Sequence, residues 1–269
     1  MNIDDTWFKD SARATASGLR VAGGGAHASK TMMLAELTIA LAGHDAFDHS
    51  VLRERVMTGN LLGKRSEAAK TATFAKLELL YGLKQRPGVF EAMLAVWRES
   101  DARPVVAAMA AVARDPLFRA TARTMLDAQV GAAVNSHDFR AILTAKMPDR
   151  FQESTIIALS ERCASSWAQA GYLSSGSDKR RKRAQPDRYS AAFAAFLAIA
   201  AGFKGRPIVE SPWFDLLDVE AESRLSLLRQ AEADGLLRLR SAGHVFDIEL
   251  RGELARIDEG VIEERGTLI

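Results

Sequence analysis

Apolar residues recur at helical spacing through most of this chain, and short turns rich in glycine or polar residues separate the repeats. Residues 66–83 give the clearest pattern, because Ser66 is suited to cap a helix whose apolar side chains share one stripe. Residues 48–57 show similar spacing and stop before Gly59. The two segments together predict a helix-turn-helix, although an ordinary helical hairpin would leave the same pattern. The stripe consists of Phe74, Leu77 and Tyr81.

The same spacing continues along the chain and predicts a mainly α fold. The predicted helices cover residues 31–42, 89–99, 104–114, 116–134, 137–146, 154–170, 191–203 and 218–233. Near the end, residues 236–240 and 244–250 are predicted to form a hairpin around a Ser-Ala-Gly turn. We therefore expect a multi-helical globular fold with helix-turn-helix or winged-helix-like elements and a small C-terminal β-hairpin.

Interruptions of the pattern suggest the domain organisation. Residues 1–18 are polar, and we expect them to be loosely ordered. Residues 19–148 would form a helical domain that contains the helix-turn-helix candidate and ends at the break Met147-Pro148-Asp149. Residues 149–269 would form a helical, winged-helix-like region with a basic loop and an acidic end.

The charge of the chain is small in total but unevenly distributed. The formal net charge is +2, yet residues 207–269 hold 7 Lys and Arg against 14 Asp and Glu. Residues 1–206 hold the remaining 29 basic against 20 acidic side chains, a net charge of +9. A basic body joined to an acidic end suggests that the two parts meet different partners.

Several classes of protein are disfavoured by the residues present. Cys163 is the single cysteine, which excludes an intramolecular disulfide and a cysteine-based metal site. The first ten residues lack the apolar core of a signal peptide, and the longest apolar run, residues 191–203, is shorter than the about 20 residues that cross a bilayer. We therefore expect a cytoplasmic protein without a membrane partner.

A first candidate anion site lies at the start of the helix that Ser66 caps. Lys64 and Arg65 precede this cap, and Lys70 follows one turn later, so positive side chains lie beside the free N–H groups of a helix start. This combination suits contact with a DNA phosphate. The alternative without a binding function is an ordinary helical hairpin whose basic end is solvated.

A second candidate follows the predicted helix at 154–170, which ends in Gly-Tyr-Leu and leads into a basic loop at 174–188. A helix that leads into a hairpin-like basic loop is the layout of a recognition helix and a wing. The loop lacks aromatic residues for base stacking, so phosphate contact is expected, and a solvated, disordered charge run is the alternative. We expect the flexible loop to contribute less per charge than the capped helix start. Its candidate contacts are Lys179, Arg180, Arg181, Lys182, Arg183 and Arg188.

The glycine-rich stretch before residue 31 nearly matches a phosphate-binding loop, with Gly24 followed by Ser29-Lys30-Thr31. Serine replaces the second glycine of that motif, and no convincing strand precedes it. A nucleotide-binding enzyme that uses residues 24–31 is thus the weaker alternative. The stronger interpretation is a flexible loop in which Ser29 caps the next helix.

No arrangement of residues indicates catalysis. The five histidines form no metal-binding motif and most are expected on surfaces or in loops, and no G-x-S-x-G is present. We expect a protein that is not an enzyme and has no cofactor or metal.

Three motifs resemble the BrxA family of bacteriophage exclusion (BREX) phage-defence systems. They are N-L-L-G-K-R-S at 60–66, D-P-L-F-R at 115–119, and a helix that starts at 154–155 and ends with A-G-Y-L at 170–173. The glycine stretch and the segment Arg206-Pro207 add to the likeness, which extends roughly from residue 19 to residue 217. The acidic helix-hairpin unit beyond that point departs from the family pattern.

The resemblance implies a nearly all-helical protein with helix-turn-helix elements that binds double-stranded DNA without known catalysis. It also implies service beside other BREX components, including a site-specific adenine methyltransferase. The function that we expect is therefore a DNA-binding accessory protein that relies mainly on phosphate contacts. A protein–protein scaffold of a defence complex is the main alternative.

Overall fold

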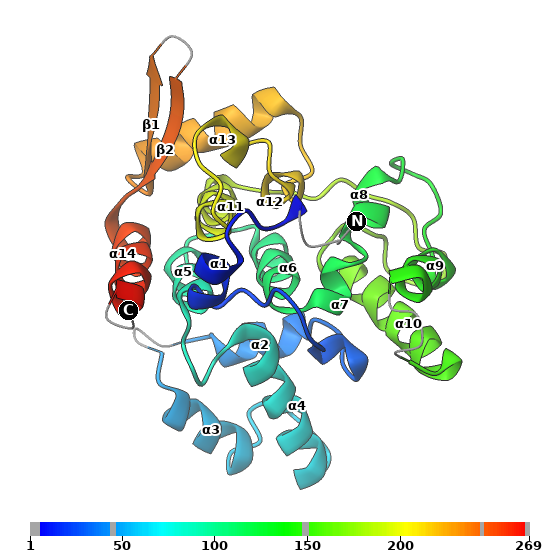
Figure 1. Cartoon of the computed structure of the whole chain (residues 1–269). Helices are drawn as coiled ribbons and strands as arrows, with labels where there is room; N and C mark the ends of the chain where they lie inside the picture. The colour runs from blue at the N-terminus through cyan, green and yellow to red at the C-terminus, as the bar shows by residue number, and fades with distance from the viewer. Residues whose placement is uncertain (1–5, 44–46, 147–150, 243–244, 267–269) are drawn as a thin grey trace.

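The structure, a computed structural model, describes residues 6–43, 47–146, 151–242 and 245–266 (Figure 1). Within these ranges the chain is mainly helical and has a small two-stranded antiparallel sheet before its last helix, which confirms the predicted fold class at this level. The helices are α1 (Ser11–Ala16), α2 (Leu34–Ala40), α3 (His49–Met57), α4 (Glu67–Tyr81), α5 (Gly88–Trp97), α6 (Arg103–Arg114), α7 (Pro116–Arg119), α8 (Ala122–Asp127), α9 (Ser136–Lys146), α10 (Glu153–Gln169), α11 (Arg188–Ala200), α12 (Pro212–Asp215), α13 (Ala221–Ala233) and α14 (Gly252–Gly266). Short 3-10 turns are η2 (Ala26–Ala28) and η3 (Arg206–Ile208), and the strands are β1 (Leu237–Ala242) and β2 (Val245–Leu250).

Two alanine-rich helices occupy the centre of the molecule. Almost every residue of α6 is buried, as is most of α11, because small side chains let neighbouring helices approach on all sides. Both helices pack against α5 and against each other. The buried apolar run predicted at 191–203 corresponds to α11.

The helix-turn-helix candidate consists of α3 and α4, which project together at the lower edge of Figure 1. The Asp48 carboxylate caps α3 by accepting the Ser50 and Val51 N–H groups, and Ser66 Oγ accepts the Ala69 N–H. Gly82 ends α4 in the left-handed conformation with φ of 79°. The two helices thus begin and end close to the positions predicted from the sequence.

The N-terminal segment differs from the expected loose chain. Trp7 and Phe8 are buried against Trp213, and the Trp213 indole N–H donates to the Trp7 carbonyl at 3.0 Å. Asp10 then caps the short helix α1. Two large aromatic side chains in a polar stretch are enough to anchor it, because each buries a large apolar area.

Other differences concern helix boundaries. The helix predicted at 116–134 is divided into α7 and α8, and its last residues are extended instead. Ser29 does not cap α2, which begins only after Met33 in the left-handed conformation. Helix α14 lies in the acidic end, where we expected no particular element.

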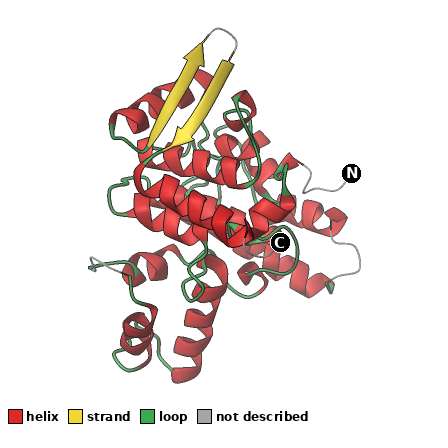
Figure 2. Cartoon of the chain, turned by 60° about the vertical axis from the view of Figure 1, so that its left-hand side comes forward, coloured by secondary structure: helices red, strands yellow, loops and turns green. Residues whose placement is uncertain are grey.

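The proposed domain boundary falls on residues 147–150, which lie outside the described residues. Side chains before and after it, from Trp7 to Leu254, belong to one continuous hydrophobic core. Helix α10 packs against both α9 and α6 and therefore joins the two sides. Two structures project from this body, the α3–α4 pair and the β-hairpin (Figures 1 and 2).

Candidate functional site

The turn between α3 and α4 is held by the side chain of Asn60. Asn60 adopts a φ of 49°, its Oδ1 accepts the Lys64 N–H at 2.8 Å, and its Nδ2 donates to the Lys64 carbonyl at 3.0 Å. An asparagine that bonds the backbone in this way tolerates the left-handed region better than most residues. The turn is therefore as well fixed as the sequence suggested.

The positive charges at this turn are largely engaged within the protein. Lys64 forms an ion pair with Glu36, with 2.7 Å between Nζ and Oε1, and this ammonium holds the Glu36 pKa below its ordinary value although burial opposes the shift. Lys70 is only 7% exposed, donates to the Met57 carbonyl at 2.6 Å and pairs with Glu67, so it bridges the two helices instead of facing solvent. Of the proposed cations in this element, Arg65 is the exposed one.

The basic segment at 179–182 is an extended arm bonded on both sides, and not the flexible loop that we expected. On one side Lys179 and Arg181 exchange backbone hydrogen bonds with residues 131–134, at 2.9 Å. On the other side the Arg180 carbonyl accepts the Ser174 N–H, and the Lys182 N–H donates to the Tyr172 carbonyl. The segment is thus the middle of three short antiparallel pieces of chain.

Side chains along this extended arm point alternately to two faces. Arg180 and Lys182 are exposed on one face, whereas Arg181 is buried on the other. Arg180 is partly engaged, with Nε 3.0 Å from Asp178 Oδ2, and Lys179 Nζ donates to the Gly176 carbonyl at 2.7 Å. Because the backbone is already fixed, docking of a ligand on this face would order little additional chain.

The buried face of the arm is tied to Asp218. Both terminal nitrogens of Arg181 reach the Asp218 carboxylate, at 2.9 and 2.7 Å, and Arg183 approaches it at 3.1 Å. The same carboxylate also accepts the Ala184 N–H at 2.9 Å. Of the proposed DNA contacts, Arg181 is therefore enclosed, and Arg183 is exposed but paired with Asp218 and Glu220.

Arg188, the last proposed contact, starts α11 and forms an ion pair with Asp234 just after α13. Its guanidinium also lies over the Tyr189 ring. The ion pair raises the pKa of Arg188 above its usual range. Most basic side chains of the two candidate elements thus form ion pairs with carboxylates of this chain. These side chains do not form one continuous basic surface of unpaired charges.

The glycine-rich stretch encloses a side chain of the protein itself. The Gly25 Cα packs so closely on Asp115 that an added Cβ would lie 1.8 Å from Oδ1. The His27 N–H donates to Asp115 Oδ2 at 2.9 Å, and the N–H groups of Leu117 and Phe118 at the start of α7 donate to Oδ1. The carboxylate of Asp115 therefore occupies the position that a bound anion would take in a phosphate-binding loop.

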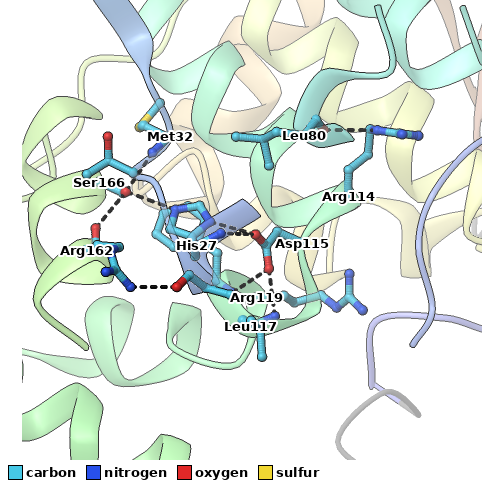
Figure 3. Close-up of polar contacts among 12 residues, drawn as sticks. His27, Met32, Leu80, Arg114, Asp115, Leu117, Arg119, Arg162 and Ser166 are labelled. Carbon is cyan, nitrogen blue, oxygen red and sulfur yellow. Dashed lines mark hydrogen bonds and ion pairs between the residues drawn. The ribbon is translucent and has the colours of Figure 1, made fainter. Parts of the chain in front are cut away.

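A polar chain continues from Asp115 through His27 to Ser166 in α10 (Figure 3). His27 Nδ1 lies 2.8 Å from Asp115 Oδ2, and Nε2 lies 2.9 Å from Ser166 Oγ. These three residue types in this order form the charge network of many hydrolases. Here all three are buried, and Ser166 Oγ also accepts the Met32 N–H and lies 2.8 Å from the Arg162 carbonyl. The arrangement joins η2, the start of α7 and α10 inside the core.

Electrostatics agree with this structural role. Burial alone would raise the Asp115 pKa, but the His27 imidazole and the donated N–H groups lower it below its ordinary value. His27 is an exception to the expectation that most histidines lie on surfaces or in loops, because it is stacked on Phe118 in the core. The sequence did hold one signal for Asp115, because Asp followed by Pro is a typical helix start.

Comparison of the chain with protein-family models, with curated proteins and with solved structures found no match. Within the described residues, no helix has both the length and the apolar character needed to span a bilayer. The resemblance to the BrxA family accordingly rests on the motifs alone.

Proposed function

We propose that this protein binds duplex DNA without catalysing a reaction, through a winged-helix-like unit formed by residues 122–182. The observation that carries the proposal is the pairing of residues 179–182 with both 131–134 and 172–174. In chain order the unit has helix α8, an extended piece, helices α9 and α10, and a hairpin whose second arm pairs back to the first piece. We interpret this order as the connectivity of a winged helix.

Residues 188–250 repeat that order, which supports the assignment. Helix α11 is followed by η3, which lies beside β2, then by α12, α13 and the β1–β2 hairpin. Helix α13 packs against α11 and β1, as α10 packs against α9. Because α13 and its surroundings carry many carboxylates, we assign DNA contact to the first unit only.

Within the first unit we assign phosphate contact to the wing side and not to helix α10. The exposed face of α10 carries Glu153 and Glu161, which a phosphate backbone would repel. Arg180 and Lys182 share the outward face of the fixed arm, and Lys179 lies near the hairpin tip. Arg65 beside α4 would add one further contact. Such contacts neutralise phosphates and specify no base sequence.

The absence of catalysis in this proposal is supported by the position of Asp115. A nucleotide phosphate at the glycine stretch would have to displace a carboxylate that accepts hydrogen bonds from His27, Leu117 and Phe118. In the setting that the BrxA resemblance implies, the protein would act beside the adenine methyltransferase and other BREX components. A DNA site on one part of the chain leaves other surfaces available for them.

The proposal is tested by measuring the binding of a fluorescent DNA duplex across a salt series. About four phosphate contacts should give a slope of log K against log salt of roughly −3 to −4. Replacing Arg180→Glu together with Lys182→Glu should lower the affinity at least about tenfold at fixed salt and reduce the slope by about 2. The far-ultraviolet circular dichroism should not change, because both side chains are exposed.

The matched control changes two exposed cations outside the proposed surface, Lys84→Glu and Arg256→Glu. This variant has the same net charge as the first one and should keep most of the affinity. Equal losses in the two variants would mean that only the net charge matters, and binding that does not depend on salt would contradict phosphate contact altogether.

A further inference from the structure

The second winged-helix-like unit leaves a groove between α13, η3 and one face of the β-hairpin. The groove has a volume of about 570 Å³, within the size range of ligand pockets. Its position follows from the hairpin, which extends beyond the helical body (Figure 2). The base of the hairpin is packed into the core, where Leu237 and Leu250 are buried, and β1 packs against α13.

The floor of the groove is apolar. Leu239 and Phe246 lie on the same face of the hairpin as the buried Ile248, because side chains alternate along each strand and Leu239 pairs with Ile248. Leu225 of α13 adds an apolar side chain that is 37% exposed. A row of partly exposed apolar side chains along a helix and a strand is suited to receive apolar side chains from a second molecule.

The rim of the groove is rich in arginine. Arg224 is engaged by Asp215 and by the Val209 carbonyl, and Glu232 accepts the Leu239 N–H at 2.8 Å. Within the described part of the chain, the Arg206 and Arg229 guanidinium groups form no hydrogen bond or ion pair. Two unengaged guanidinium groups therefore border an apolar floor, although the surrounding region is acidic overall.

We propose that this groove docks an amphipathic helix of a partner protein, one that presents two or three apolar side chains flanked by carboxylates. Leucine-type side chains would cover Leu225, Leu239 and Phe246, and carboxylates would pair with Arg206 and Arg229. A nucleic acid suits the site poorly because the floor is apolar. The surface is separate from the proposed DNA contacts, so either proposal can fail alone.

The test uses a fluorescein-labelled helical peptide with leucines at positions i, i+3, i+4 and i+7 and glutamates on both sides of that stripe. Fluorescence anisotropy with the full-length protein should show saturable binding. Arg206→Glu together with Arg229→Glu should weaken it at least about tenfold, since both carboxylate partners are lost. Leu225→Ser should weaken it severalfold with an unchanged melting temperature, because this side chain is already partly exposed.

The matched control is Lys84→Glu with Arg256→Glu, which changes two exposed cations that do not line the groove. This variant should bind the peptide like the wild type. A peptide with lysines in place of the glutamates, or with serines in place of the leucines, should not bind. No binding of the acidic peptide, equal loss in both double variants, or displacement of the peptide by duplex DNA would overturn the proposal.

Discussion

Two buried carboxylates, Asp115 and Asp218, have similar roles in different parts of the molecule. Asp115 lies between the glycine-rich stretch and α7 and accepts bonds from backbone N–H groups and an imidazole. Asp218 lies below the basic arm and accepts bonds from the guanidinium groups of Arg181 and Arg183. Each carboxylate accepts hydrogen bonds from a segment whose sequence has the composition of an anion-binding site.

The two sites differ in which polar side chains remain exposed to solvent. Around Asp115 every polar atom of the network is enclosed, so the glycine-rich stretch is a structural joint. Around Asp218 only one face of the arm is enclosed, and Arg180 and Lys182 remain exposed on the other face. A carboxylate of the chain can therefore occupy one apparent anion site and hold the backbone of another in place.

The largest effect should follow from Gly25→Ala, which attacks the Asp115 joint through packing. The new Cβ would lie 1.8 Å from Asp115 Oδ1, so the network must separate or the stretch must move. We expect a loss of about 4 kcal/mol or more in the free energy of unfolding, measured in urea. Gly260→Ala is the control, because nothing lies within 4 Å of its added Cβ and the helical site favours alanine. Equal stability of the two variants would show that Asp115 is not closely enclosed.

Asp115→Asn should have the next largest effect and should depend on pH. Removing the charge from a buried, paired carboxylate costs about 3 to 5 kcal/mol near neutral pH. Because folding lowers the pKa of Asp115, its stabilisation is fully present above the ordinary value of 3.8 and is lost as the pH falls through the lower folded-state pKa. The stability difference between wild type and variant should therefore shrink at the acid end. A difference that stays constant below pH 3.8 would contradict a lowered pKa.

Asp218→Asn should destabilise least, by about 2 to 3 kcal/mol, because asparagine keeps some hydrogen bonds and tolerates the left-handed φ of 57° at this position. Its clearest effect should be local. Loss of the counter-charge frees the arm that contains residues 179–183, so trypsin should cleave there faster than in the wild type while circular dichroism stays the same. Asp178→Asn is the control, since that exposed carboxylate pairs only with Arg180 at the surface. Equal cleavage of wild type and the Asp218 variant would mean that Asp218 does not hold the arm.

The local structure of the candidate site was predictable in detail. Ser66 caps α4 and Gly82 ends it, as their residue types indicate. The arm at 179–183 was predicted as a hairpin-like wing, but its pairing with residues 131–134 was hidden because that stretch was assigned to a helix. His27 and Ser166 gave no sequence signal, since nothing near either residue indicates that they meet.

The sequence by itself determined where several helices begin and end, such as α3 and α4, which of their faces are apolar, and that a hairpin follows α13. These features depend on residues within a few positions of one another, through caps, turns and side-chain periodicity. Only the tertiary structure decided which charges remain free, because most of the pairs that engage them join residues far apart in the chain. Arg181 and Asp218 are 37 positions apart, and His27 and Asp115 are 88 apart. A buried charge must find a partner wherever the packing places one, and local sequence does not record that place.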